Sequence, residues 1–303
     1  MMKLHEMIPK RLRSGGIIVP LLIGMTSYSA QAAPPGGLPF GAYDPPGEFS
    51  TDRELTTEHL FLPWEDVFLG SLYDADVYAR ERNRDLMVTI EPWTWTRDSR
   101  NTPSFLINGI RTGLYDENMR AICSILDDLE SDVTVRWAQE MDDDSGQFIW
   151  SNWEPSIYVS AFQRMINVCR SVAPDVTVMW SPLGREGLEE YYPGDDYVDV
   201  IGLSVFGLQA WEEEILGEAQ TFTDIFGPRY ERVQGFGKPV IVAELGYVGD
   251  AGYVDDWENS VRQDYPEYPR LTSVVYFNQQ EVYPWPDDFG LPDWKVSERV
   301  VRQ

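Results

Sequence analysis

Short β-rich runs alternate with helical patterns along most of this chain, and this alternation constrains its fold more than any other feature. Eight runs have the length and the Val, Ile, Leu and Phe content of strands buried in a sheet. Strands that alternate with helices favour a parallel sheet, because each connection must return to the start of the next strand. The β-rich runs are residues 40–44, 59–63, 86–92, 133–141, 176–181, 198–206, 239–245 and 271–277, and helical spacing is clearest over 117–130, 155–173, 222–234 and 254–264.

These units predict a single-domain α/β fold over residues 40–303, a (β/α)8 TIM barrel. An open doubly wound sheet is the alternative arrangement of the same elements. No G-x-G-x-x-G segment follows a strand run, so the nucleotide site that such open sheets carry has no support in the sequence. A TIM barrel places its functional side chains where strands end and the following loops begin.

The first 32 residues have the layout of a secretory signal peptide, 1–32. A basic start precedes a short apolar stretch, residues 16–25, and an Ala-x-Ala cleavage pattern ends at Ala32. The apolar stretch is shorter than the span of about 20 residues that crosses a bilayer; an uncleaved anchor is the alternative. We therefore expect a secreted or periplasmic protein without a membrane span, with residues 33–39 as a flexible lead-in.

The balance of residue types excludes several classes of function. The chain carries 50 acidic and 24 basic residues, a formal net charge of −26, which argues against a nucleic-acid partner. Its two histidines and two cysteines are too few for a multi-histidine metal site, a zinc ribbon or an iron–sulfur cluster. A Ser-His-Asp site would depend on His59 alone, since His5 lies in the signal peptide. We predict no metal and no cofactor, and expect carboxylates to carry the chemistry.

The two cysteines, Cys123 and Cys169, each fall on the apolar face of a predicted helix. In an oxidising compartment the two thiols can pair, provided that their Cα atoms lie within about 7 Å of each other. The sequence does not fix that distance. A disulfide between the two helices and two buried free thiols are both compatible with it.

Two glutamates end strand runs that face each other in the predicted barrel. Glu140 ends the fourth run, VTVRWAQE, and Glu244 ends the seventh, PVIVAE. A carboxylate is costly to bury, and a salt-bridged loop residue is the simple explanation for either glutamate alone. Two carboxylates across a barrel mouth are also what glycoside hydrolysis requires, one to protonate the leaving oxygen and one to stay ionised. That chemistry needs neither a histidine nor a metal.

Four segments resemble glycoside hydrolase family 26, a family of retaining (β/α)8 enzymes with catalytic glutamates on strands four and seven. VRWAQEMDD (135–143) is similar to the acid/base segment of the family, and PVIVAELG (239–246) is similar to its nucleophile strand. FGAYDP (40–45) resembles its first strand and YYPGDDYVDVIGLSVFG (191–207) its sixth-strand region. The resemblance implies that Glu140 is the acid/base and Glu244 the nucleophile. It also implies a β-mannan, a mixed-linkage β-glucan or a β-xylan as substrate.

The chain departs from the family pattern next to both glutamates. Gln139 replaces the histidine that precedes the acid/base, and Asp142 replaces an asparagine. Phe206 stands where the family has a tyrosine that supports the nucleophile, so the nucleophile needs another hydrogen-bond donor. Tyr247 and Gln139 are the nearest candidates for that donor. These changes predict a reshaped sugar subsite and better activity on a β-glucan-type polymer than on plant mannan.

Aromatic side chains close to strand ends offer flat apolar surfaces on which sugar rings stack. We expect some of them to bind substrate together with Gln139 and Phe206. The aromatic candidates are Trp93, Trp95, Trp150, Trp153, Tyr247 and Trp285.

The sequence therefore predicts an exported retaining endo-β-glycanase whose partner is a neutral β-glycan; it does not predict an oligomeric state. A non-catalytic carbohydrate-binding or polysaccharide-assembly protein on the same barrel is the alternative, because Gln139 and Phe206 depart from the family pattern. A soluble scaffold with an unrelated partner is a third hypothesis. The net charge makes uronate-rich polymers the least favoured substrates.

Overall fold

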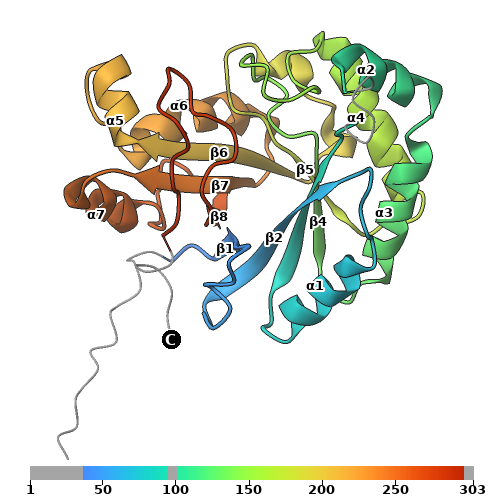
Figure 1. The fold of residues 1–303 in the computed structure, drawn as a ribbon, viewed down its shortest axis with the longest axis horizontal. Helices are drawn as coiled ribbons and strands as arrows, with labels where there is room; N and C mark the ends of the chain where they lie inside the picture. The colour runs from blue at the N-terminus through green and yellow to red at the C-terminus, as the bar shows by residue number, and fades with distance from the viewer. Residues whose placement is uncertain (1–36, 95–100, 297–303) are drawn as a thin grey trace, which may run out of the picture. The chain divides into compact units, whose positions relative to one another are not determined.

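The computed structural model describes residues 37–94 and 101–296, so the predicted signal peptide, most of the lead-in and Trp95 lie outside the described residues. Within that part, eight parallel strands close into a barrel in chain order, with β8 hydrogen-bonded to β1 (Figure 1). The predicted TIM barrel is confirmed, and the open-sheet alternative is wrong. The strands are β1 (Phe40–Tyr43), β2 (Leu55–Pro63), β3 (Asp85–Glu91), β4 (Val133–Trp137), β5 (Thr177–Trp180), β6 (Val200–Leu208), β7 (Val240–Val248) and β8 (Leu271–Phe277).

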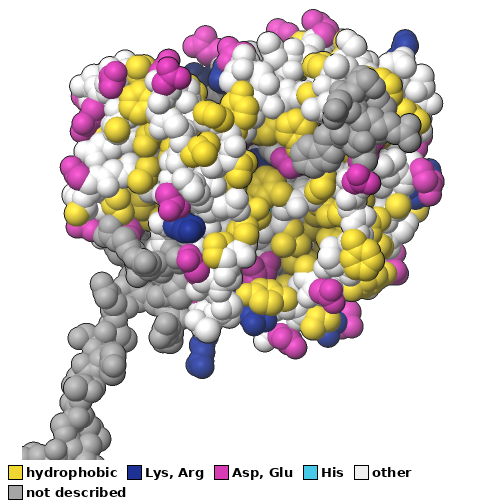
Figure 2. Space-filling view, in the orientation of Figure 1, with side chains coloured by type: hydrophobic (Ala, Val, Ile, Leu, Met, Phe, Trp, Pro, Cys, Tyr) yellow, Lys and Arg dark blue, Asp and Glu magenta, His cyan; other side chains and the backbone are white. Residues whose placement is uncertain are grey.

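Helices lie outside the strands and contribute their apolar faces to one large core (Figure 1). All four intervals with clear helical spacing form helices, and further α-helices follow β2, β3 and β6. Figure 2 shows hydrophobic side chains gathered toward the middle of one face, with acidic side chains scattered around its rim. The helices are α1 (Ser71–Arg80), α2 (Pro103–Thr112), α3 (Asp116–Asp128), α4 (Pro155–Arg170), α5 (Gln209–Trp211), α6 (Phe222–Val233) and α7 (Ala251–Ser260).

The connection from β5 to β6 contains no α-helix, and its glycines and prolines explain why. It makes only two short 3-10 turns, η2 (Leu188–Tyr191) and η3 (Asp195–Tyr197). Gly184 lies in this connection with φ +89°, and a Cβ there would approach the Cβ of Arg229 to 2.8 Å. A residue with a side chain is disfavoured on both counts, so this position of the connection requires glycine.

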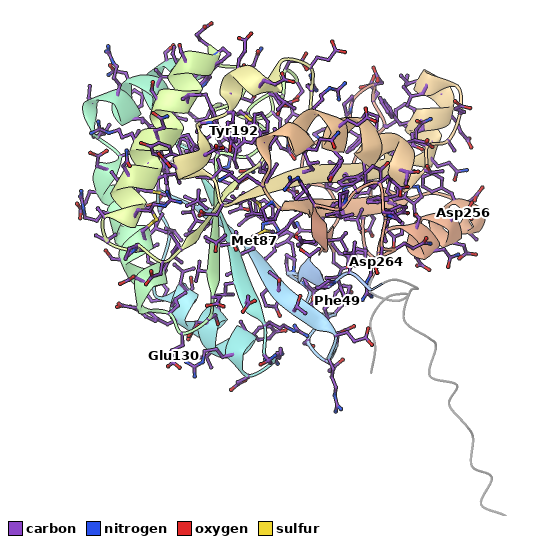
Figure 3. All side chains as sticks on the ribbon, turned by 180° about the vertical axis from the view of Figure 1, so that it is seen from behind. Phe49, Met87, Glu130, Tyr192, Asp256 and Asp264 are labelled. Carbon is purple, nitrogen blue, oxygen red and sulfur yellow. A yellow bond between two sulfur atoms is a disulfide. The ribbon has the colours of Figure 1, made fainter. Side chains whose placement is uncertain are left out.

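The inside of the barrel is layered along its axis, because alternate residues of each strand point inward. On β3 these residues are Met87, Thr89 and Glu91. Met87 packs in a small apolar cluster with side chains of four other strands, and Figure 3 shows it among the converging strands while Glu130 and Asp256 lie at the periphery. Thr89 belongs to a polar layer, and Glu91 reaches the carboxyl ends of the strands. Polar side chains are therefore concentrated toward that end.

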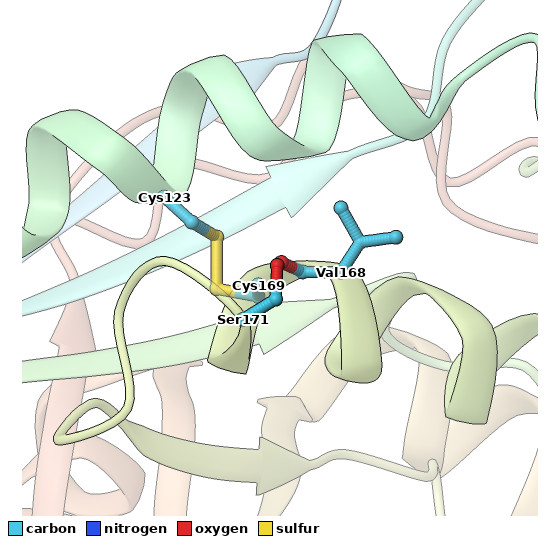
Figure 4. Close-up of a disulfide and its surroundings, with 4 residues drawn as sticks. All are labelled: Cys123, Val168, Cys169 and Ser171. Atoms are coloured by element: carbon cyan, nitrogen blue, oxygen red, sulfur yellow. A yellow bond between two sulfur atoms is a disulfide. The ribbon is translucent and has the colours of Figure 1, made fainter.

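Cys123 of α3 and Cys169 of α4 form a disulfide, with their Cα atoms 5.2 Å apart (Figure 4). The structure thus selects the disulfide from the two arrangements that the sequence allows. The bridge joins two neighbouring outer helices, away from the carboxyl ends of the strands. No helix in the described part of the chain is long and apolar enough to cross a membrane.

Candidate active site

Glu140 follows β4 in a kinked segment whose conformation is held by its neighbours. Ala138 and Glu140 have φ values of +48° and +56°, a left-handed conformation that residues other than glycine rarely adopt. The amide of Glu140 donates to the carbonyl of Ser181 (2.7 Å), and that of Ala138 donates to the carbonyl of Ile90 (3.2 Å). Strained backbone of this kind persists where surrounding structure enforces it, often at functional sites. The half-buried Glu140 side chain is therefore aimed by the neighbouring strands.

Glu244 lies within β7, at a point where the pairing of the strand is irregular. The register of β7 shifts between Val242 and Leu245 against β8, and that of β6 shifts between Leu203 and Ser204 against β7. Such bulges re-aim a side chain within a strand. Glu244 is 7% exposed, so its carboxylate needs a partner inside the barrel.

Arg136 is that partner. It lies on β4 with a completely buried side chain, and its Nη1 donates to the Glu244 Oε1 at 2.5 Å. Its Nε also donates to the Ser181 hydroxyl at 2.9 Å, and Nη2 to the Ser204 hydroxyl at 3.4 Å. The two side chains proposed from the sequence as donors to Glu244 do not fill that role. Gln139 donates elsewhere, and Tyr247 is buried against the ring of Trp257, with centroids 5.5 Å apart.

Ser204 connects the two glutamates. Its hydroxyl donates to the Glu140 Oε1 and lies within hydrogen-bond distance of the Arg136 guanidinium. Ser204 is the register partner of Glu244 on the neighbouring strand. One buried arginine thus contacts Glu244 directly and reaches Glu140 through a single hydroxyl, so the structure brings the two predicted catalytic side chains into one network.

The surroundings of the two carboxyl groups differ, and this separates their proton affinities. Burial, followed by the nearby Glu244 charge, raises the pKa of Glu140 to about 8. Burial also raises the pKa of Glu244, but the Arg136 ion pair opposes that rise. Because Arg136 pairs directly with Glu244 and only indirectly with Glu140, it favours the charged form of Glu244 more than that of Glu140. A neutral acid beside an ionised carboxylate is the arrangement that carboxylate-based acid catalysis needs.

Glu91 is a third carboxylate at the site that the sequence analysis missed. It ends β3 as Glu140 and Glu244 end their strand runs, so the same rule applied to LMVTIE would have found it. Its Oε1 accepts a hydrogen bond from the Gln139 side-chain amide (2.9 Å), and its Oε2 accepts one from the Trp93 indole (3.2 Å). Burial raises its pKa, and the Gln139 bond opposes this most. Burial also raises the pKa of Tyr43 on β1 to about 12, with the Glu91 and Glu244 charges adding to the rise.

The aromatic candidates near β3 and β4 differ in exposure. Trp93 is half-buried, and its ring meets that of Trp150 edge to face, with centroids 4.7 Å apart. Trp150 is fully buried and donates its indole N–H to the Gln139 carbonyl at 2.7 Å. Trp153 is 5% exposed and donates to the carbonyl of Ile149 at 2.9 Å. Of these three, Trp93 offers the most surface to a ligand, and Trp150 and Trp153 support the loop around it.

The segment after β8 brings a second group of aromatic side chains to the site. In Figure 1 it runs, in dark red, beside β6 and β7. The half-buried ring of Trp285 meets Phe206 and Trp294 with centroids 6.1 and 5.1 Å apart. Gly246 follows Glu244 by two residues, and a Cβ there would lie 2.7 Å from the Phe206 ring. The structure therefore gathers Phe206 and Trp285 near the end of β7, whereas Tyr247 faces the helices.

Asp142 ties the loop after β4 to the loop after β5. Its carboxylate accepts three backbone N–H bonds from residues 183–185, at 2.6 to 3.0 Å. Arg185 also forms ion pairs with Asp143, at 3.2 Å, and with Asp144. An asparagine has a single carbonyl oxygen beside an NH2 group, so it would accept at most the two bonds made to one oxygen of Asp142, and without the charge that strengthens them. The acidic run thus has local partners, and within residues 37–94 and 101–296 no three His, Cys, Asp or Glu side chains are arranged to hold a metal ion.

His59 is buried in β2, and its Nε2 lies 2.7 Å from the Thr89 hydroxyl. Burial, assisted by the charge of Arg136, lowers its pKa well below the ordinary value, so the imidazole stays neutral. Thr89 lies 3.4 Å from Arg136 as well, which makes His59 part of the polar layer beneath the carboxylates.

Comparison with known proteins places this geometry in context. The sequence model of Glycosyl hydrolase family 26 matches residues 111–259, a segment that contains Glu140, Arg136 and Glu244. The chain resembles that family. Endoglucanase H of Acetivibrio thermocellus is 24% identical over 314 residues, which cover 91% of this chain and 32% of that protein. A β-1,3-xylanase of an Alcaligenes species is 26% identical over 120 residues, covering 37% of this chain and 24% of that protein. The chain thus spans about a third of the length of the first relative.

Solved structures share the fold at low sequence identity. The modular endo-β-1,4-mannanase of Cellulomonas fimi matches with a TM-score of 0.61 and 16% identity, over 87% of this chain and 70% of that one. A family 26 β-mannanase of Bacteroides ovatus matches with a TM-score of 0.56 and 14% identity, over 80% of this chain and 81% of that one. These likenesses show the barrel fold.

Proposed function

We propose that this chain is an exported retaining endo-β-glycanase that hydrolyses a neutral β-linked polysaccharide. The observation that carries the proposal is the network of Glu140, Ser204, Arg136 and Glu244, in which the Arg136 ion pair favours the charged form of Glu244 over that of Glu140. A binding protein has no use for that asymmetry, and burying two carboxyl groups costs stability.

The mechanism that fits these groups is a double displacement. Glu140 donates its proton to the glycosidic oxygen while the Glu244 carboxylate attacks the anomeric carbon, which forms a glycosyl-enzyme ester and releases the leaving sugar. Glu140, now ionised, then takes a proton from water as that water attacks the anomeric carbon and frees Glu244. Arg136 balances the charge of Glu244 before attack and after release. For this route the two carboxyl groups must lie about 5–5.5 Å apart.

The proposed substrate is a neutral β-glycan of the glucan type. Endoglucanase H aligns with nearly the whole chain, and the replacement of a family histidine by Gln139 and of a tyrosine by Phe206 sets the site apart from the family pattern. The net charge of −26 and the carboxylates Glu91 and Glu244 disfavour uronate polymers by repulsion.

Initial rates of reducing-sugar release on mixed-linkage β-glucan, β-1,3-xylan, β-mannan and a polyuronate test the proposal. We expect the highest kcat/KM on the glucan, lower values on the xylan and the mannan, and none on the polyuronate. A preference for mannan would refute the substrate class, and a preference for the polyuronate would refute the charge argument. Oligosaccharide binding without release from any polymer would favour the non-catalytic alternative.

Export is proposed from the signal-peptide pattern of residues 1–32. Amino-terminal sequencing of the protein recovered from the periplasm or the medium should begin at Ala33. An intact amino terminus on a membrane-bound protein would instead support the anchor alternative.

A further inference from the structure

Glu91 is a half-buried carboxylate beside the catalytic pair that the proposed mechanism does not use. It points inward at the end of β3, on the same side of the strand as Met87 and Thr89. Burying a carboxylate is costly unless its hydrogen bonds repay the loss of water. Its carboxylate accepts hydrogen bonds from the side chains of Gln139 and Trp93, at 2.9 and 3.2 Å. Both are residues that the sequence predicts to bind substrate.

The Gln139 amide depends on Glu91 for its orientation. An ionised carboxylate only accepts hydrogen bonds, so it draws the NH2 group of the amide toward itself and turns the carbonyl oxygen away. That oxygen, Oε1, is buried and has no hydrogen-bond partner among the described residues. No other bond of the Gln139 side chain therefore distinguishes the two orientations of its amide.

The Trp93 ring is fixed in a comparable way. Its indole N–H donates to Glu91, and its ring meets Trp150 edge to face at 69°. The Trp93 carbonyl in turn accepts the indole N–H of Trp64 at 3.0 Å, which anchors the backbone beneath the ring. Because Trp93 is half-buried, one part of the ring packs and another part stays available to a ligand.

We propose that Glu91 is a positioning residue that fixes the buried Gln139 amide and holds the half-buried Trp93 ring in the orientation in which that ring contacts the sugar. This inference rests on the proposed function, since it concerns the same site. Glu91 also lies within electrostatic reach of Glu140 and Arg136, and its charge acts on Glu244 and Tyr43. Its ionised form therefore contributes to the repulsion that favours the protonated form of Glu140.

Two substitutions separate the hydrogen bonds of Glu91 from its charge. Glu91→Gln keeps the shape but removes the charge that strengthens both bonds. Its own NH2 group must also face either the Trp93 N–H or the Gln139 amide, and in the second case the Gln139 amide turns over so that its oxygen accepts. Glu91→Asp keeps the charge but shortens the side chain by one methylene, so both bonds lengthen. A hydrogen bond to a charged group is worth about 1.5–3 kcal/mol, so each variant should lose about 10- to 100-fold in kcat/KM on β-glucan.

The pH profile distinguishes positioning from general weakening of the fold. Without the Glu91 charge the pKa of Glu140 falls, so the alkaline limb of kcat/KM should move to lower pH in Glu91→Gln and stay in place in Glu91→Asp. Asp76→Asn is the matched control. Asp76 is a buried carboxylate that accepts two backbone N–H bonds, at 2.9 and 3.4 Å, just before the amino end of β4. This control should lower the melting temperature and leave both kcat/KM and the limbs of its pH profile unchanged.

Binding supplies a readout that does not depend on turnover. Titration of a β-gluco-oligosaccharide, followed by tryptophan fluorescence, should show about tenfold weaker affinity for both Glu91 variants and wild-type affinity for Asp76→Asn. Wild-type kcat/KM, pH limbs and affinity in Glu91→Gln and Glu91→Asp would overturn the inference while leaving the proposed function intact. A wild-type protein that neither binds nor hydrolyses any neutral glycan would overturn both.

Discussion

Replacement of Arg136 by methionine tests how the network divides charge between the two glutamates. Methionine retains most of the apolar length of the side chain but removes the cation beside Glu244. The Arg136 side chain is 0% exposed and that of Glu244 is 9% exposed, so water does not take over the lost interaction. Removing one partner of a buried ion pair costs about 3–5 kcal/mol. At about 2–4 °C per kcal/mol, this predicts a melting temperature lower by roughly 6–20 °C.

The same substitution should change the pH dependence of catalysis in a defined direction. Arg136 opposes the rise that burial causes in the pKa of Glu244, so its removal raises that pKa further. The nucleophile must be ionised, so the acid limb of kcat/KM should move to higher pH. The lost charge-assisted bond, about 1.5–3 kcal/mol, predicts a kcat about 10- to 100-fold lower at the optimum.

Arg84→Met is the matched control for this experiment. Arg84 is also fully buried, and it pairs with Glu58, whose side chain is 10% exposed, at the amino end of β3. Thermal unfolding by circular dichroism and pH–rate profiles on soluble β-glucan should be measured for both variants. Both should lose stability, but only Arg136→Met should shift the acid limb. An unshifted limb in Arg136→Met, together with equal losses of stability, would mean that Arg136 serves packing alone.

Three further predictions concern the glutamates and the disulfide. Glu244→Ala should abolish turnover of all substrates, whereas Glu140→Ala should keep activity on aryl glycosides with good leaving groups, because these need little protonation; equal losses on both substrates would contradict the assignment. Burial raises the pKa of Glu140 in the folded protein from its ordinary 4.5 to about 8, so the wild type should lose stability as the pH rises between these values. Glu140→Gln lacks this loss, so its melting temperature should rise relative to that of the wild type from pH 5 to pH 8. A constant difference between the two melting temperatures would refute the raised pKa of Glu140. Alkylation of the denatured, unreduced protein should add no alkyl groups by intact mass, and reduction should cost about 2–4 kcal/mol of stability.

The barrel was predictable from the sequence because strand and helix patterns alternate regularly. The outcome at β4 shows the limit of that reasoning. The run 133–141 was expected as one strand, but β4 ends at Trp137, and the segment to Glu140 turns through left-handed backbone that no propensity encodes. Long-range bonds to β3 and to the end of β5 enforce that turn, and such bonds are invisible in a local pattern.

The candidate site was predictable where a charged side chain lies within or directly after an apolar strand run. Glu140 and Glu244 are carboxylates after apolar strands, and Arg136 within VTVRW carries the same signal, as does Glu91 after LMVTI. What the sequence does not give is which of these groups pair. Arg136 on β4 donates to Glu244 on β7 because the two side chains reach the same level inside the barrel. The level of Glu244 depends on the register shifts of β6 and β7, which no local sequence pattern predicts.

Covalent trapping tests the central claim most directly. A 2-deoxy-2-fluoro β-glucoside oligomer with a good leaving group slows the second step of a retaining enzyme, so the glycosyl-enzyme ester should accumulate. Peptide mapping by mass spectrometry should then find one adduct, on Glu244, and none on Glu140 or Glu91. An adduct on either of those glutamates would reassign the nucleophile. Turnover of the unmodified substrate with inversion of anomeric configuration, and no adduct, would contradict the double displacement.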